Sequence, residues 1–176
     1  MATERIIMAW NECDISIAQS QEDGSFPTTN LTSVGTIKDK SSTLEPSDGD
    51  TLEMKKTGGK VVASESNEGG FLLKTRVIEP TSALMTMFGL GTAEGDDFKV
   101  KTHIVDGNFA VKVEPKKVGA MGVKAPLTDV KYKPGWSEED GNYVDLEFNI
   151  LQGPADYWYS RFKKTASTQT TSTTEG

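Results

Sequence analysis

The sequence predicts a mainly β fold: an antiparallel β-sandwich or barrel-like domain with one short α-helix packed against it. Two observations support this prediction. Most of the chain alternates apolar and polar residues with a period of two, in short runs separated by polar turns. Only residues 80–91 space their apolar side chains as a helix does. About ten short strands and one helix indicate a single β domain.

Six candidate strands occupy the first half of the chain. In the second of them, Cys13, Ile15 and Ile17 alternate with more polar or smaller residues, as one buried face of a strand requires. The sequence KTGGK at 56–60 predicts a turn between two of the strands. The six candidate strands are residues 4–10, 13–19, 31–37, 51–56, 60–66 and 70–79.

A polar stretch interrupts this pattern at residues 35–56, GTIKDKSSTLEPSDGDTLEMKK. Its middle, residues 38–50, has almost no apolar side chain, which predicts a long loop between two strands. Pro46 and Gly49 favour turns there. Strands on both sides are needed for one core, so we expect one domain over residues 1–163 that carries this loop. Residues 164–176 have no apolar residue larger than alanine, and we expect a disordered Thr/Ser-rich tail.

The helix is expected within residues 80–91, PTSALMTMFGLG. Thr81 or Ser82 is suited to cap its start, and Gly89 or Gly91 to end it. Its apolar side would lie on the sheet. The side chains that form this apolar pattern are Ala83, Leu84, Met87 and Phe88, and we expect Met85, Met87 and Phe88 in the core.

Four more strands follow the helix. Residues 98–105 and 109–113 flank Asp106-Gly107, a dipeptide that favours a type I′ turn, so they predict a hairpin. Residues 125–133 are the next strand. Residues 143–151 are the last, with Val144, Leu146, Phe148 and Ile150 on one face and Tyr143, Asp145, Glu147 and Asn149 on the other.

The charge is unevenly distributed. The net charge is −7; residues 1–58 hold five basic and ten acidic residues, residues 59–133 eleven and nine, and residues 134–176 three and seven. The division fits either an ordinary solvated surface or self-association through complementary faces.

The sequence also indicates a compartment. The single cysteine, Cys13, excludes an intramolecular disulfide, the N-terminus has no apolar signal core, and no stretch approaches the ~20 apolar residues of a membrane span. We therefore expect a soluble protein, made in the cytoplasm, with no membrane partner.

Catalytic and metal-binding patterns are missing. The lone His103 is expected to face solvent on a strand, and Cys13 to be a small buried side chain. No P-loop, GxSxG or HExxH motif occurs, and one histidine with one cysteine is too few for a zinc site. We expect no enzyme and no cofactor. Three acidic groups lack the EF-hand ligand order and are interpreted as polar turns: Asp48, Asp50 and Glu53; Glu94, Asp96 and Asp97; Glu138, Glu139 and Asp140.

Nucleic-acid binding is not favoured either. Residues 99–133 hold eight lysines against three acidic residues, but no arginine and no interleaved stacking aromatics. The calculated pI of the chain, about 4.8, argues against tight DNA binding.

The order of these features resembles the tail tube (major tail) proteins of tailed phages and prophages. The resemblance covers residues 1–163. It lies in the β domain, the polar stretch 35–56, the strand GFLLKTRVIE that leads into the helix PTSALMTMFGLG, and the closing strand YVDLEFNIL. It implies a structural subunit that forms hexameric rings. The rings would stack into a tube that conducts DNA without binding it specifically.

The resemblance also implies partners and candidate residues. The subunit would bind itself and other tail proteins, in a virion tail assembled in the bacterial host cytoplasm. Asp145 and Glu147 are candidate lumen or interface residues, since acidic side chains would repel DNA phosphates. The loop 38–50 would be the ring-stacking element, and its candidate residues are Lys38, Asp39, Lys40, Glu45, Asp48 and Asp50.

Two alternatives remain open at this stage. One is a non-catalytic β-sandwich binding module that recognises a glycan or a protein through its loops. The other is a different virion component, a head decoration or tail-completion protein.

Overall fold

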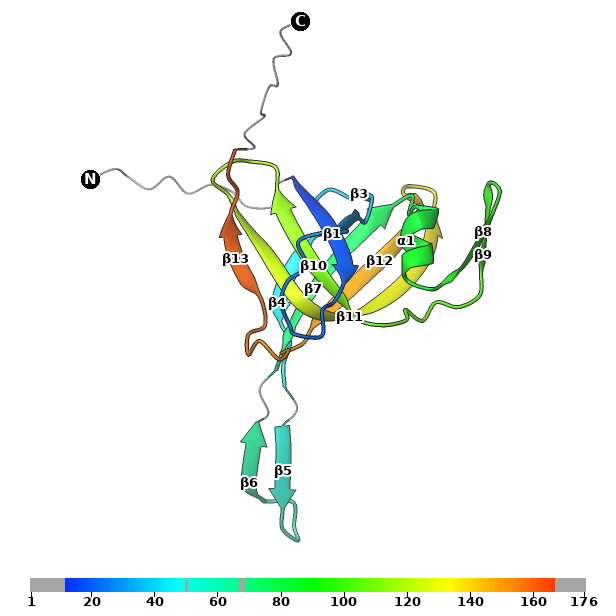
Figure 1. Ribbon diagram of the computed structural model, residues 1–176. Helices are drawn as coiled ribbons and strands as arrows, with labels where there is room; N and C mark the ends of the chain where they lie inside the picture. The colour runs from blue at the N-terminus through cyan, green and yellow to red at the C-terminus, as the bar shows by residue number, and fades with distance from the viewer. Residues whose placement is uncertain (1–11, 50, 67–68, 167–176) are drawn as a thin grey trace, which may run out of the picture.

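A curled antiparallel sheet of nine strands forms the body of the protein (Figure 1). The computed structural model describes residues 12–49, 51–66 and 69–166. The nine-stranded curled sheet confirms the predicted mainly β, barrel-like fold. The five long strands, in spatial order, are β1 (Cys13–Gln19), β10 (Phe109–Pro115), β11 (Met121–Ser137), β12 (Gly141–Ile150) and β7 (Phe71–Ile78).

Short strands complete the sheet at its edges. β2 (Thr32–Ser33) pairs with β1, and β3 (Thr36–Ile37) follows at once and pairs with β7. Residues 32–37 therefore bridge the two ends of the row of long strands, which is what makes the sheet barrel-like. Two further strands extend it: β4 (Thr43–Pro46) pairs with β7, and β13 (Ser160–Lys163) pairs with the start of β11.

The core fills the inside of this sheet, and strict alternation places it there. On β12 the expected apolar face is buried, because Val144, Leu146, Phe148 and Ile150 all turn inward. β1 and β10 contribute in the same way through Ile15, Ile17, Val111 and Val113. The other face of each strand is thereby left for polar side chains.

The helix α1 (Ser82–Met87) is where the sequence predicted it. The Thr81 hydroxyl accepts a hydrogen bond from the Leu84 amide at 3.2 Å, and Gly89 follows with a φ of 70°, suited to a residue just past a helix end. Leu84 and Phe88 are fully buried, and the Phe88 ring meets Phe109 edge-on at 5.1 Å. Met85 and Met87 are partly buried against the core, while Ala83 is exposed.

The polar stretch 38–50 is not a plain loop. Its middle is β4, which pairs antiparallel with β7, and β5 (Thr51–Lys55) then pairs with β6 (Val61–Ser66). The Ser47 amide donates to the Gly70 carbonyl at 2.8 Å, so the two pairings belong to one long β-ribbon. Residues 38–49 and 51–55 thus lie on the outgoing leg of that ribbon, and residues 61–66 and 69–78 lie on its return leg. Its turn at KTGGK is confirmed by the hydrogen bond from Lys56 N to Lys60 O, 3.1 Å.

The prediction of a hairpin around Asp106-Gly107 is wrong. Residues 97–100 form β9 (Asp97–Val100). This strand pairs antiparallel with the preceding strand, β8 (Gly91–Glu94), through a two-residue turn. Gly95, the first residue of that turn, has a φ of 61°, as glycine at this place in a type II′ turn has. β10 instead pairs with β1 and β11, because its Val111 and Val113 are needed inside the main sheet.

Two sequence expectations fall outside the described residues: the first strand at 4–10 and the last ten residues of the tail. Asp50 also lies outside them. Over the described part of the chain, no helix has the length and apolar character needed to cross a membrane.

Candidate assembly surface

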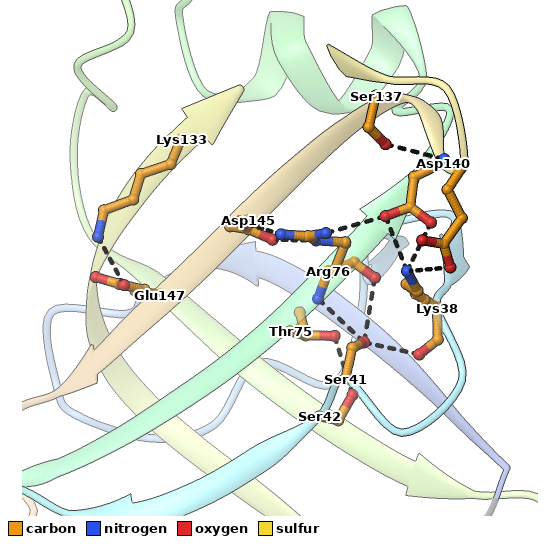
Figure 2. A network of polar contacts seen from close by, with 11 residues as sticks. Lys38, Ser41, Ser42, Thr75, Arg76, Lys133, Ser137, Asp140, Asp145 and Glu147 are labelled. Carbon is orange, nitrogen blue, oxygen red and sulfur yellow. Dashed lines mark hydrogen bonds and ion pairs between the residues drawn. The ribbon is translucent and has the colours of Figure 1, made fainter. Parts of the chain in front are cut away.

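A ladder of opposite charges covers the outward face of β7, β12 and β11 (Figure 2). The register places Arg76 opposite Asp145 and Lys74 opposite Glu147. On the other side of β12, Lys133 lies opposite Asp145 and Lys131 opposite Glu147. Opposite charges on directly paired residues of an antiparallel sheet attract each other, so the ladder supports the register of the three strands.

Arg76 is the centre of this face. Its Nε and Nη2 atoms donate to the two carboxylate oxygens of Asp145 at 2.7 and 2.9 Å, the bidentate geometry that suits a guanidinium. The guanidinium also lies 4.1 Å from the centre of the Tyr143 ring. That ring in turn covers Gly135, where an added Cβ would come within 2.4 Å of it. Gly135 therefore makes room for the ring beneath Arg76.

A second carboxylate, Asp140, joins Arg76 to Lys38. Asp140 accepts from Arg76 Nη1 at 2.9 Å and lies 2.7 Å from Lys38 Nζ, and its side chain is only 5% exposed. The hydrogen bond from Lys38 holds the pKa of Asp140 below its ordinary value, and Arg76 adds to this while burial opposes it. The contact with Asp140 likewise raises the pKa of Lys38. We call Lys38, Arg76, Asp140 and Asp145 the charge clamp.

Hydroxyl groups fix the backbone beside the clamp. The Ser41 hydroxyl accepts from the Arg76 amide at 3.2 Å and donates to the Lys38 carbonyl at 2.7 Å. Ser42 and Thr75 share a hydrogen bond of 2.9 Å between their hydroxyls. The Lys38 amide donates to the Arg76 carbonyl at 2.9 Å. The start of the polar stretch is therefore held against β7 by side chains and backbone together.

The two candidate lumen residues lie on this face, and neither carboxylate is free in the single chain. Asp145 is paired with Arg76, and Glu147 accepts from Lys133 at 2.7 Å. A carboxylate neutralised in this way repels a phosphate much less than a free one. The pairing is compatible with an interface or lumen position, but it removes most of the electrostatic argument for the lumen.

The residues proposed for ring stacking are divided among different environments. Lys38 is part of the charge clamp, and Glu45 pairs with Lys74 at 2.7 Å on the sheet. Asp39, Lys40 and Asp48 are exposed, and Asp50 lies outside the described residues. The structure connects Lys38 to the predicted interface residue Asp145 through the clamp. The exposed side chains of Asp39, Lys40 and Asp48 take no part in the clamp.

Beyond β4 the ribbon leaves the body of the protein. β5 and β6 form a separate two-stranded sheet, which we call the arm, and Figure 1 shows it extending away from the main sheet. Met54 is 66% exposed and Val61 42%. The base of the arm is tightly closed, because a Cβ on Gly69 would lie 1.7 Å from the Ser47 carbonyl oxygen. The arm is therefore an extension of the sheet with exposed apolar side chains at Met54 and Val61.

The structure places the two residues that the sequence offered for catalysis, Cys13 and His103. Cys13 is half-buried, and burial raises the pKa of its thiol, which disfavours the reactive thiolate. His103 is exposed, as expected, but it follows β9 instead of lying within a strand. Within the described ranges, no three His, Cys, Asp or Glu side chains are grouped as metal ligands would be.

Two hollows flank residues 38–41. Each has a volume of about 450 Å³. One lies between these residues and the start of β1, and the other lies over the ladder next to Arg76 and Lys133. Both are lined by polar and charged side chains, and among these Lys38 and Arg76 already have ion-pair partners.

Comparison with models of known protein families gives no match, and comparison with curated proteins finds no relative.

Sequence reasoning missed Arg76 and Asp140, the two residues that connect the clamp. A signal for Arg76 was present in the sequence. The basic residues Lys74 and Arg76 are two positions apart on one predicted strand, and the acidic residues Asp145 and Glu147 have the same spacing on another. For Asp140 the sequence predicts only a place in a polar turn. Its contact with Lys38 joins residues about a hundred positions apart, and no local pattern indicates it.

Proposed function

We propose that this chain is a structural, self-assembling subunit of a phage-type tail tube, without catalytic activity. In this proposal, subunits form rings, hexameric in the family that the sequence resembles, and the rings stack around a lumen that conducts DNA. The subunit would be incorporated into the virion tail in the cytoplasm of a bacterial host, together with other tail proteins.

The observation that carries the proposal is the arm. It is a two-stranded extension, separate from the main sheet and with exposed apolar side chains at Met54 and Val61. A two-stranded hairpin is marginally stable by itself in water, so an extension of this kind gains stability from a partner surface. A stacking subunit needs such an element, because it has to reach a neighbour beyond its own ring.

The charged ladder supports the same proposal in a modified form. A lumen that lets DNA pass should bind phosphates weakly. On the ladder, Lys74 is paired with Glu45, Arg76 with Asp145, and Lys133 with Glu147. We therefore assign low affinity for DNA to charge pairing on this face, and not to an excess of acidic residues.

The test of this function is negative-stain electron microscopy of the concentrated purified protein, combined with light scattering. The expected result is rings or tubes whose proportion increases with protein concentration. A monodisperse monomer at every concentration and salt condition would contradict the proposal.

A second candidate function, a non-catalytic binding module, is favoured by the two hollows beside residues 38–41. It predicts that a glycan or peptide binds the monomer and that substitution of Lys40, which lines both hollows, weakens binding. Titration of the monomer against glycan and peptide libraries distinguishes the two candidates, because the tube subunit binds neither.

A further inference from the structure

Two hairpins of this protein lie outside the main sheet. The arm is one of them and β8–β9 is the other, and each is a separate two-stranded sheet. In Figure 1 they extend in different directions, the arm downward and β8–β9 to the right. Because isolated two-stranded hairpins are marginal in water, both are candidates for contacts with another chain.

The hairpin β8–β9 is amphipathic. Its register places Gly91 opposite Val100 and Ala93 opposite Phe98, so these four residues share one face. Val100 is 62% exposed and Ala93 is exposed too, so this apolar face is largely uncovered. The opposite face is polar and includes the ion pair between Lys99 and Glu94.

The arm has an apolar side as well. Met54 lies opposite Ala63 in the register, and both are exposed. The opposite side carries Glu53, which pairs with Lys55 at 3.0 Å. Each hairpin therefore offers one apolar side and one side with an internal ion pair.

The tips of the two hairpins have opposite charges. The arm turns through Lys56 and Lys60, and neither ammonium group has an ion-pair partner among the side chains that the structure describes. The tip of β8–β9 carries Asp96 in the turn and Asp97 at the start of β9, and within the same described part of the chain neither carboxylate is in an ion pair. Each hairpin thus has exposed apolar residues that could pack on those of the other, and the free charges at the two tips have opposite signs.

We propose that the arm of one copy binds hairpin β8–β9 of the next copy. The Met54–Ala63 side packs on the side that carries Ala93 and Val100, and Lys56 and Lys60 lie against Asp96 and Asp97. This inference rests on the proposed function and names the surface that the arm would bind.

The geometry of such a contact determines the kind of assembly. The two surfaces differ, so the contact is heterologous, and each copy keeps one unused hairpin after binding a neighbour. Contacts of this kind propagate along an axis, as ring stacking requires. Free tip charges are screened by salt, with a Debye length of about 8 Å at 0.15 M ionic strength, so the association should weaken as salt increases.

The test reverses the charge at each tip. One variant is K56E/K60E, with an acidic arm tip, and the other is D96K/D97K, with a basic hairpin tip. Both spare the internal pairs Glu53–Lys55 and Glu94–Lys99, so the hairpins themselves stay intact. K116E/K117E changes two exposed lysines in the connection between β10 and β11 and is the matched control.

Sedimentation velocity measures association of each variant alone and of the two mixed in equal amounts. Each variant alone should associate about tenfold more weakly than the wild type or worse, because like charges meet at every contact. The mixture should recover assembly, since an acidic arm then meets a basic hairpin and a basic arm meets an acidic hairpin. The control should assemble as the wild type does.

The outcomes separate this inference from the proposed function. If the wild type forms tubes and each variant alone forms them equally well, or if the mixture does not recover assembly, the hairpin contact is wrong and the tube proposal stands. If the wild type forms only linear head-to-tail chains and the mixture recovers them, the contact stands and the tube proposal fails. A wild type that stays monomeric overturns both.

Discussion

Arg76 on β7 and Asp145 on β12 are direct neighbours in the sheet, and the guanidinium donates two hydrogen bonds to the carboxylate, at 2.7 and 2.9 Å. Because Arg76 also donates to Asp140, one side chain connects the middle of the sheet with the turn between β11 and β12. This arrangement gives the first two predictions.

Arg76→Lys should destabilise the protein by about 1 to 2 kcal/mol, because an ammonium replaces the planar fork and loses one of the charge-assisted hydrogen bonds. Urea unfolding at pH 7 measures the change. The control is Lys133→Met, which removes the exposed pair with Glu147 and should cost less than about 1 kcal/mol. Equal costs for the two variants would show that Arg76 is only another surface charge.

Asp140 gives a pH dependence with a definite sign. Its pKa in the folded protein is depressed, chiefly by Lys38, so its carboxylate stabilises the fold above the unfolded value of about 3.9. That contribution is lost as pH falls through the folded pKa. The stability difference between the wild type and Asp140→Asn should therefore be constant above about pH 5 and shrink below about pH 4. Urea unfolding from pH 3 to 7 measures it, and a difference independent of pH would contradict the clamp.

Gly69 should tolerate no side chain. An added Cβ would meet the Ser47 carbonyl oxygen at 1.7 Å and the Gly49 amide nitrogen at 2.7 Å, both of them backbone atoms. Gly69→Ala should cost about 1 to 3 kcal/mol in unfolding free energy, or force the base of the arm open. Gly153→Ala, whose Cβ would meet only Leu127 at 3.5 Å, is the control and should be nearly neutral. Similar stability of the two variants would show that the base of the ribbon is loose.

Phe88 should be among the most sensitive positions in the core. It is fully buried, and its ring contacts Phe109 and Tyr132 edge-on, at 5.1 and 6.2 Å between centroids. Phe88→Ala should cost about 3 to 5 kcal/mol, measured by urea unfolding. The exposed Ala83 on the same helix, changed to serine, should cost less than about 1 kcal/mol. A small effect at Phe88 would mean that α1 does not cover the core.

Local patterns predicted those parts of the fold that depend on local physics. Alternation placed Val144 and Leu146 inside the sheet, and helical spacing with a capping threonine located α1. β4 was missed because only Leu44 of its four residues is turned toward the core, so the strand appears polar in the sequence. Its pairing depends on β7, nearly thirty residues further on.

The false hairpin has a different cause. Asp106-Gly107 has the composition of a tight turn, but Gly95-Asp96 has it too, and the second competes for the same strand. The main sheet decides between them, since Val111 and Val113 are buried against β1 and β11. Charge pairing across strands, as at Asp145, depends on the register of the whole sheet and was likewise beyond local patterns.

The central claim is that the arm assembles the protein and is not needed to fold it. Its direct test replaces residues 50–68 with Asn-Gly, a dipeptide that favours a tight turn. The two hydrogen bonds between Ser47 and Gly70 at the base of the arm already hold the flanking segments together. Sedimentation velocity with negative-stain microscopy then compares the variant with the wild type. We expect a variant with an unchanged urea midpoint that stays monomeric where the wild type forms rings or tubes. Tubes formed by the armless variant as readily as by the wild type would contradict the account.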